Sequence, residues 1–166
     1  MTSDKYAKLM TGIRKIVRAI NLESKRVQKE LDISIPQLLT LKHLQDRVDY
    51  KSTMKETKGF LSLNASTVSG IVSRLEQKGL VARLPDPKDK RSTPIVLTSK
   101  GNHLLVRSNE SLHERISKNL ELIEEVDFLQ IINSLETLIN LFNIQDVDAS
   151  PIITGQATIE NKLSTN

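Results

Sequence analysis

Residues 64–97 are predicted to form an amphipathic helix followed by two short strands, and a densely charged segment lies between the strands. Asn64 is a good helix N-cap and Gly79 a good helix stop, so the residues between them are predicted to be helical. The strand candidates, Leu80–Leu84 and Thr93–Leu97, flank DPKDKR at residues 86–91, which holds five charges and one proline. A hairpin turn needs only about two to five residues and little charge, so this tip requires an explanation beyond chain reversal.

A second short helix is predicted just before the first. Ser52 is a candidate N-cap for a helix from Thr53 to Phe60, and about four residues join that helix to the one that follows Asn64, as in a helix-turn-helix. Pro94 has no N–H to donate, so the second strand is expected to lie at a sheet edge or to begin beyond that residue. Two helices followed by a hairpin make a winged helix-turn-helix.

Long amphipathic helices are predicted on both sides of this unit, because apolar residues recur there at spacings of three and four. The first helix has a strongly basic polar face and is expected to end near Leu31. The apolar stripes comprise Tyr6, Leu9, Ile13, Ile16 and Ile20 in the first helix and Phe128, Ile131, Leu135, Leu138 and Phe142 in the last.

Further helices fill the chain between these elements. Ser34 and Gln37 form a capping-box signature, which predicts a short helix from there to Val48. After the second strand, Thr98 is expected to cap one long helix that runs to Ile123. The predicted fold is mainly α, with an N-terminal helix over 1–33, a winged helix-turn-helix over 34–98, C-terminal helices over 99–145, and a polar tail over 146–166 that is either disordered or loosely packed.

Positive charge is concentrated in the middle of the chain. Residues 50–101 contain ten Lys or Arg against four Asp or Glu, whereas residues 110–166 contain three against ten. This asymmetry is typical of a polyanion partner for one region, although chance clustering on a solvated surface gives the same count. The sequence has no cysteine, no apolar run near the roughly 18 residues of a membrane span, and no signal-peptide pattern at its start. A cytoplasmic protein without a membrane partner is therefore expected.

The polar face of the helix after Asn64 is built from small residues and one arginine. A solvated helix face usually carries Glu, Lys and Gln, whereas Ser, Thr and Gly cost helix stability. A DNA major groove would offset that cost, because small side chains allow close approach, and hydroxyl and guanidinium groups bond to phosphates and base edges. Close packing against another helix is the alternative explanation. The candidate DNA-binding residues here are Asn64, Ser66, Thr67, Ser69, Gly70, Ser73 and Arg74.

Residues 64–101 resemble the recognition helix and wing of the multiple-antibiotic-resistance regulator (MarR) family. The resemblance rests on S-T-V-S at 66–69, R-L-E-Q-K-G-L-V at 74–81, Arg83 and D-P-x-D-x-R at 86–91. Leu97, Thr98 and Gly101 follow at the family spacing. The flanking helices match by pattern alone.

The resemblance implies a homodimeric transcriptional regulator that binds double-stranded DNA in a sequence-specific manner. The first and last helices would pair across a two-fold axis, so the segments 1–33 and 99–145 and their apolar stripes would serve dimerisation, an internal core, or both. A repressor with a pseudo-palindromic operator is expected. Many family members bind a small-molecule effector, and a pocket is expected between the first helix, the helix from Pro36 and the helix after Thr98. Aromatic residues make up only 3% of the sequence, which argues against an aromatic cage.

The charged tip would be the wing of this fold. Lys88, Lys90 and Arg91 are the candidate contacts with phosphates and with the minor groove, whose negative potential attracts an inserted arginine. The two aspartates would be repelled by DNA and are expected to shape the wing instead. Asp86 would start the turn, and Asp89 would orient a nearby arginine through a charge-assisted hydrogen bond.

The sequence contains no motif that is typical of a catalytic site. There is no glycine-rich phosphate loop, no Ser/His/Asp order and no pair of histidines four residues apart, so neither an enzyme nor a cofactor is expected. One alternative is a winged helix that contacts another protein and not DNA. The other is a zinc-responsive regulator of the same fold, with His103, His113, Glu110 and Glu114 as the candidate ligands, although no bound metal is expected.

Overall fold

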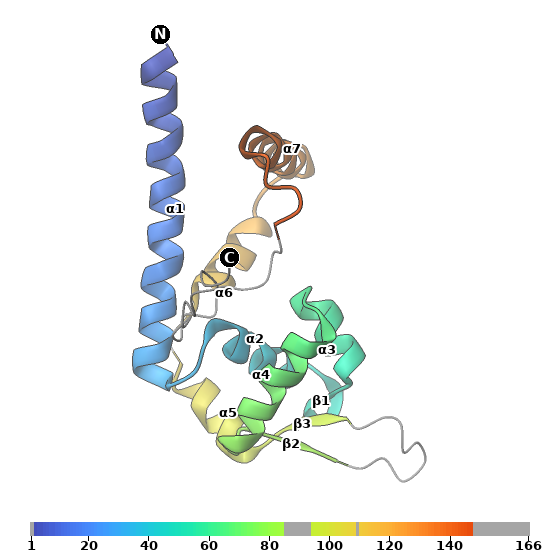
Figure 1. Ribbon diagram of the computed structural model, residues 1–166. Helices are drawn as coiled ribbons and strands as arrows, with labels where there is room; N and C mark the ends of the chain where they lie inside the picture. Colours follow the sequence, from blue (N-terminus) through green and yellow to red (C-terminus); the bar gives the residue numbers. More distant parts are fainter. Residues whose placement is uncertain (1, 85–93, 109, 148–166) are drawn as a thin grey trace, which may run out of the picture.

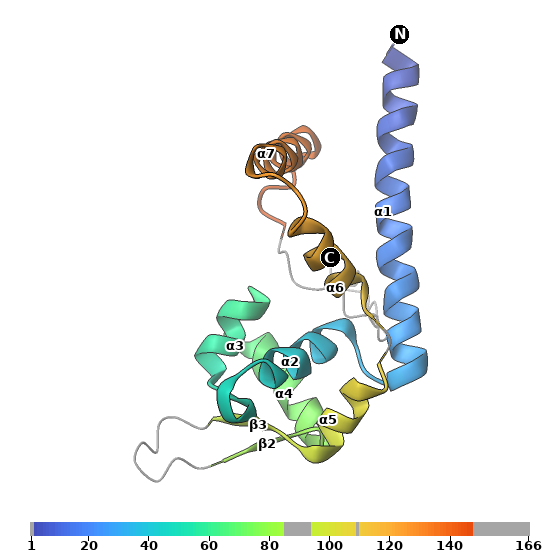
Figure 2. The same cartoon turned by 180° about the vertical axis from the view of Figure 1, so that it is seen from behind.

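The computed structural model describes residues 2–84, 94–108 and 110–147. Two helical arms project from one side of a lobe that is built from helices and a small sheet (Figures 1 and 2). One arm is α1 (Thr2–Leu31), a single helix of 30 residues whose end agrees with the sequence prediction. The other arm is α6 (Leu112–Leu120) followed by α7 (Glu125–Phe142). In both views α7 lies away from α1, whereas the start of α6 contacts α1 near the lobe, with the Leu112 N–H donating to Glu23 at 2.9 Å.

The lobe contains the predicted winged helix-turn-helix and also the helix after Thr98, which the sequence analysis assigned to the C-terminal helices. Its helices are α2 (Ile35–Gln45), α3 (Met54–Leu61), α4 (Ala65–Gln77) and α5 (Ser99–Val106). The apolar faces of these helices meet in one core with the sheet, and Leu41, Leu44, Val68, Val72, Leu75 and Ile95 are completely buried there. Burial of these side chains is the main source of stability for the lobe, at about 25 cal/mol per Å² of apolar surface removed from water.

The sheet has three antiparallel strands in the order β1-β3-β2, one more than the sequence predicts. β2 (Val81–Arg83) pairs with β3 (Ile95–Leu97), and β3 begins just beyond Pro94, as expected for a residue without an N–H. The additional strand is β1 (Lys51–Ser52), which pairs with the other edge of β3. A strand of two residues carries no readable alternation, so only its partner reveals it.

The prediction that α2 continues to Val48 is wrong. α2 ends at Gln45, and Val48 begins a short 3₁₀ turn, η1 (Val48–Tyr50), in which its side chain is 88% exposed. Asp49 and Tyr50 both adopt the left-handed conformation, with φ near 55°. Because a right-handed helix cannot pass through that region, the chain turns there into β1.

The cap of α3 is Thr53 and not Ser52. The Thr53 side chain accepts a hydrogen bond from the Glu56 N–H, and the Glu56 carboxylate accepts one from the Thr53 N–H at 2.8 Å. Ser52 instead lies buried, and its Oγ is 3.0 Å from Nε2 of His43 in α2. The ring of His43 also stacks on Phe60 of α3, with ring centroids 4.4 Å apart. This cluster fastens β1 and α3 to α2.

Acidification should lower the free energy of unfolding of the lobe, because His43 becomes protonated more readily in the unfolded chain. Burial, together with the positive charge of Arg47, lowers the pKa of this histidine, so the folded lobe favours the neutral ring. The unfolded chain has a histidine pKa near 6.5 and binds the proton more readily, so stability is present above about pH 6.5 and is lost below it. Urea unfolding between about pH 7.5 and 5.5 should therefore show a falling free energy of unfolding. His43→Gln should flatten that slope, and an unchanged slope would contradict this role.

The expectation of one helix from Thr98 to Ile123 is also wrong. Thr98 does cap α5, because its Oγ accepts from the Gly101 N–H at 3.1 Å, but α5 ends at Val106. Ser108 Oγ then donates to the Leu105 carbonyl, which closes the helix end. Ser111 caps α6 in a capping box with Glu114, so the chain starts a second helix in a new direction.

Gly101 in the first turn of α5 leaves room for the chain that enters β2. A Cβ at this position would collide with the Leu80 backbone carbonyl and would lie 2.7 Å from Leu97 Cδ1. We expect Gly101→Ala to lower the free energy of unfolding by about 1–3 kcal/mol, because the collision is with backbone that cannot move freely. Gly59→Ala is the matched control, since a Cβ at Gly59 has no neighbour within 4 Å and alanine favours the helix. The free energy of unfolding of both variants can be measured by chemical denaturation. Equal values for Gly101→Ala and Gly59→Ala would contradict this account.

Candidate nucleic-acid interface

The predicted recognition helix is α4, and its two faces differ as the sequence predicts. Asn64 caps the helix, with its Oδ1 accepting from the Thr67 N–H at 2.8 Å. Val68, Ile71, Val72 and Leu75 are buried in the lobe and fix the orientation of the helix. Gly79 follows in the left-handed conformation with φ 69°, which turns the chain into β2 without strain. The opposite side of α4 therefore faces outward.

We refer to Ser66, Ser69, Gly70, Ser73 and Arg74 as the polar face of α4. Ser66, Ser69 and Arg74 are exposed, whereas Gly70 and Ser73 are half-buried, as is Thr67 beside them. Arg74 lies next to Gly70, because a Cβ at Gly70 would be 3.8 Å from Arg74 Nη2. Within the described residues, the side chains of Ser69 and Arg74 make no hydrogen bond or ion pair. The structure thus brings these candidate residues together on one surface, where Ser66 Oγ also donates to Asn64 Oδ1 at 2.7 Å.

Arg83, at the end of β2, contributes a contact that sequence analysis did not identify. Its Nη2 donates to Ser73 Oγ at 3.1 Å, and its Nε lies 3.5 Å from Glu76 Oε2. This arginine therefore joins the first strand of the wing to the polar face of α4. The residue belongs to the family motif, but its partners lie seven and ten positions away on another element, so only the fold reveals the contact.

The C-terminal end of α4 is held by two lysines. Lys78 Nζ forms an ion pair with Asp32 just after α1, with Nζ and Oδ2 2.7 Å apart, and this contact lowers the pKa of the Asp32 carboxyl. Lys100 Nζ of α5 donates to the Lys78 carbonyl at 2.7 Å. The end of the candidate recognition helix is thereby connected to α1 and α5.

Half of the predicted wing lies outside the described residues. Lys88, Lys90 and Arg91, predicted to contact DNA, and Asp86 and Asp89, predicted to shape the turn, all fall there. The described base of the hairpin ends with Leu84 N–H donating to the Pro94 carbonyl at 3.0 Å. This base is joined to α4 through Arg83, which contacts Ser73 and Glu76.

A charged network fills the space where α1, α2 and α6 meet. Lys42 of α2 forms an ion pair with Glu114 and donates to Ser111 Oγ at 3.3 Å. Glu23 of α1 accepts from the Leu112 N–H at 2.9 Å and pairs with Arg26. Burial opposes ionisation of Glu114, but hydrogen bonds from Lys42 and Ser111 outweigh it and lower the pKa of Glu114 to about 2. The network fixes the base of the α6–α7 arm to the lobe.

The sequence predicts a ligand cavity between α1, α2 and the helix after Thr98, and the cavity in the structure has a different lining. A cavity of about 330 Å³ does lie between α1 and α5, but its lining consists of Lys29, Glu30, Leu31, Asp32, Leu80, Lys100, His103, Leu104 and Arg107, without a described residue of α2.

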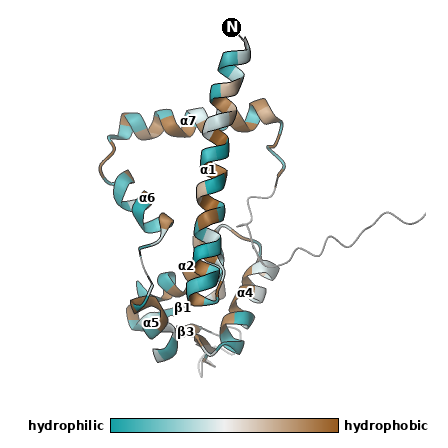
Figure 3. Ribbon diagram, turned by 90° about the vertical axis from the view of Figure 1, so that its left-hand side faces the viewer, coloured by the Kyte–Doolittle hydropathy of each residue, from teal (hydrophilic) through white to brown (hydrophobic). Residues whose placement is uncertain are grey.

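The apolar stripes of the two arms are open to solvent in the single chain. Figure 3 shows apolar residues along α7 and the middle of α1. Exposed fractions are 65% for Tyr6, 60% for Ile16 and 47% for Leu135, and α7 contains no buried residue. Of the ten stripe residues, Ile131 and Phe142 are also exposed, and Leu9, Ile13, Ile20, Phe128 and Leu138 are half-buried. The stripes therefore do not form an internal core among the described residues; α1 contributes Val27 to the core, and Leu31 at its end packs against it.

Metal and membrane sites receive no support from the described part of the chain. Residues 2–84, 94–108 and 110–147 hold no group of three His, Asp or Glu side chains that could bind a metal ion. In the same residues, no helix combines the length and the apolar character needed to cross a membrane.

Comparisons with known proteins agree with this geometry. The sequence model of the MarR family matches residues 33–93. The multiple antibiotic resistance protein MarR of Escherichia coli (strain K12) is 31% identical over 129 residues, which cover 72% of this chain and 86% of that protein. The transcriptional regulator BldR from Sulfolobus solfataricus has a similar structure, with a TM-score of 0.54 and 27% identity over 84% of this chain and 98% of that one. Sco3205 from Streptomyces coelicolor, a MarR family regulator solved in complex with DNA, has a TM-score of 0.64 at 18% identity and covers 91% of this chain and 94% of that one.

Proposed function

This chain belongs to the MarR family of winged-helix transcriptional regulators, and we propose that it is a homodimeric repressor that binds a pseudo-palindromic operator and releases it when a small molecule binds. The observation that carries the DNA-binding part is the polar face of α4. A helix whose exposed side carries small hydroxyl residues and an arginine without a partner among the described residues is suited to the major groove, and its buried opposite face fixes its orientation. Relatives in this family are regulators and not enzymes, in agreement with the absence of catalytic motifs.

Each proposed DNA contact has a distinct role. Ser66, Thr67, Ser69 and Ser73 would bond to phosphates and base edges, and the free amides at the Asn64-capped start of α4 would favour a phosphate. Gly70 would allow close approach beside Arg74. From the wing, Lys88, Lys90 and Arg91 would add contacts with phosphates and the minor groove, with Asp86 and Asp89 shaping the tip.

The proposed dimer is supported by the two arms. Exposed apolar patches on a protein surface mark interaction sites, and the stripes of α1 and α7 are two such patches, on elements that extend away from the lobe. A second copy of the same chain would cover both stripes. It would also present two copies of α4 to successive major grooves, about one helical turn apart.

A direct test is binding to genomic DNA. Fragments selected by the full-length protein should share a pseudo-palindromic sequence, and gel-shift and anisotropy titrations should show affinity that falls steeply with salt. Reporter expression from the selected promoter would rise when the regulator is deleted if it is a repressor. A protein that bound no duplex at any salt concentration would instead be a protein-interaction module, the main alternative for this fold.

Arg74→Ala should weaken DNA binding in a salt-dependent way. Loss of one phosphate contact reduces the slope of log affinity against log salt by about one per subunit, so the dimer should lose about two. The expected loss of affinity at moderate salt is about tenfold or more. Arg115→Ala on α6 removes the same charge at a position remote from α4 and should leave the slope unchanged. If Arg74→Ala and the unmodified protein had equal salt slopes, Arg74 would not be a DNA contact.

A further inference from the structure

Ser66, on the polar face of α4, has a fixed direction of hydrogen bonding. The Thr67 N–H donates to Asn64 Oδ1 at 2.8 Å, which identifies that atom as the oxygen of the Asn64 amide. Ser66 Oγ lies 2.7 Å from the same oxygen and must donate in this bond, because an amide oxygen carries no proton. The one proton of the Ser66 hydroxyl is therefore engaged, and only its lone pairs remain available to a ligand.

Ser73 is the opposite case on the same face. Its Oγ accepts from Arg83 Nη2 at 3.1 Å, and no described residue accepts the Ser73 proton. Ser73 is therefore able to donate to a ligand, whereas Ser66 is able only to accept. The two hydroxyl groups differ because their neighbours come from different elements, the cap of α4 for Ser66 and β2 for Ser73.

The hydrogen-bonding groups of DNA distinguish these two serines. Phosphate and deoxyribose oxygens only accept, so they cannot bond to a hydroxyl group whose proton is already engaged. In the major groove, the only donors are the amino groups of adenine and cytosine. Ser66 is exposed in the first turn of α4, at the end of a recognition helix that contacts base edges. A hydrogen bond between Ser66 and DNA therefore reads a base and not the backbone.

Asn64 places a donor beside this acceptor. Its Nδ2 group belongs to the same amide that holds Ser66, and it donates to no described residue, although the side chain is exposed. Adenine offers the matching pair on one edge, because its N7 accepts and its N6 amino group donates. Cytosine offers only the donor on its own edge. The combination of Asn64 and Ser66 therefore favours adenine.

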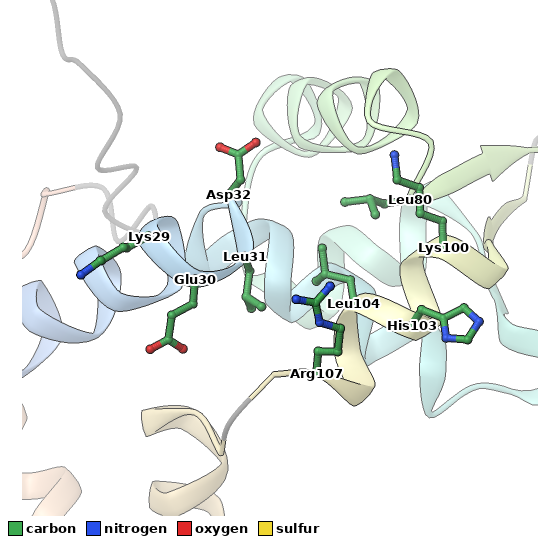
Figure 4. Close-up of a pocket in the computed structure, with 9 residues that line it drawn as sticks. All are labelled: Lys29, Glu30, Leu31, Asp32, Leu80, Lys100, His103, Leu104 and Arg107. Carbon is green, nitrogen blue, oxygen red and sulfur yellow. The ribbon is translucent and has the colours of Figure 1, made fainter.

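Selective contacts of this kind require a helix that is held in one position. The apolar face of α4 is buried, and Lys78 at its C-terminal end is held from two sides. Lys78 pairs with Asp32 after α1, and its carbonyl accepts from Lys100 of α5; Figure 4 shows Asp32 and Lys100 on these two elements. A side chain on a fixed helix is positioned more precisely than one on a loop.

We propose that Ser66 and Asn64 read one adenine in each half of the operator. Ser66 Oγ accepts from the N6 amino group, and Asn64 Nδ2 donates to N7. This assignment rests on the proposed DNA-binding function and adds the identity of a base to it. Ser73 cannot replace Ser66 at the amino group, because the bond from Arg83 leaves Ser73 as a donor.

An operator with modified adenines tests the Ser66 contact. The base 2-aminopurine pairs with thymine but has no amino group in the major groove, and it can replace each adenine of the selected duplex in turn. At one position per half-site it should lower the affinity of the full-length protein by about fivefold, through loss of one hydrogen bond. Ser66→Ala should bind the unmodified duplex about fivefold more weakly for each half-site and should lose nothing further with 2-aminopurine at that position.

The Asn64 contact has a parallel test at the same position. The base 7-deazaadenine lacks N7 and keeps the amino group, so it should also weaken binding by the unmodified protein. Asn64→Ser keeps a good helix cap but removes the amide donor, and it should be insensitive to 7-deazaadenine. A protein in which Asn64→Ser stayed fully sensitive would contradict the N7 contact.

Ser73→Ala is the matched control, because it removes a hydroxyl group from the same face. Whatever its affinity, this variant should keep the full response to 2-aminopurine. The base assignment is overturned if the duplex is bound and no adenine responds to 2-aminopurine, or if Ser66→Ala responds as the unmodified protein does. A protein that bound no duplex would fail the proposed function itself, and the base assignment would fall with it.

Discussion

Ser69→Glu should abolish specific DNA binding while leaving the protein folded. Ser69 is exposed on the polar face of α4 and makes no side-chain hydrogen bond with another described residue, so its replacement removes no such bond from the lobe. Glutamate favours a helix more than serine does, so the free energy of unfolding should stay constant or rise slightly. In a major groove the new carboxylate would face phosphates and acceptor groups twice per dimer. We expect a loss of affinity of about 100-fold or more, measured by anisotropy with the selected duplex.

The matched control introduces the same charge elsewhere on the lobe. Ser99 is exposed in the first turn of α5, where a glutamate is favourable for the helix. Ser99→Glu should bind DNA nearly as well as the unmodified protein. If both variants lose affinity alike, net charge and not position decides the result. If Ser69→Glu binds normally, the polar face of α4 is not the DNA surface.

Leu135→Asp should separate the proposed dimer into monomers. Leu135 lies near the middle of the α7 stripe and is 47% exposed in the single chain, so a second copy would bury it. An unpaired carboxylate in that interface would cost several kcal/mol in each subunit, because a buried charge loses its hydration. Since Leu135 has no core role, the lobe should stay folded. Sedimentation equilibrium should report one chain per particle, and operator affinity should fall by about 100-fold through loss of paired binding.

Asn133→Asp provides the comparison on the same helix. Asn133 is exposed, and at helical spacing it lies on the side of α7 opposite Leu135. The same new charge there should leave the dimer intact. If Leu135→Asp remained dimeric, the α7 stripe would not be part of the interface. A wild-type protein that sedimented as a monomer would contradict the homodimer itself.

Much of the helix-turn-helix could be predicted from local sequence patterns. The Asn64 cap, the buried face of α4 and the stop at Gly79 are three local signals, each set by residues no more than four positions from the next. All three were confirmed. Two local signals were nevertheless missed. The capping boxes that start α3 at Thr53 and α6 at Ser111 both have a glutamate three residues later, and these would have corrected the α3 cap and the single long helix after the wing.

The sequence by itself therefore determined the fold class, the recognition-helix candidate and the family, because these depend on caps, periodicity and a motif in fixed order. Only the tertiary structure decided which distant side chains meet. β1 pairs with a strand more than forty residues later, Arg83 reaches Ser73 from the wing, and Lys100 reaches the end of α4 from another helix. The cavity belongs to the same class, since its wall joins the end of α1 to Leu80 and Leu104. Contacts of this kind arise from the packing of whole elements around a shared core, and no local pattern encodes their partners.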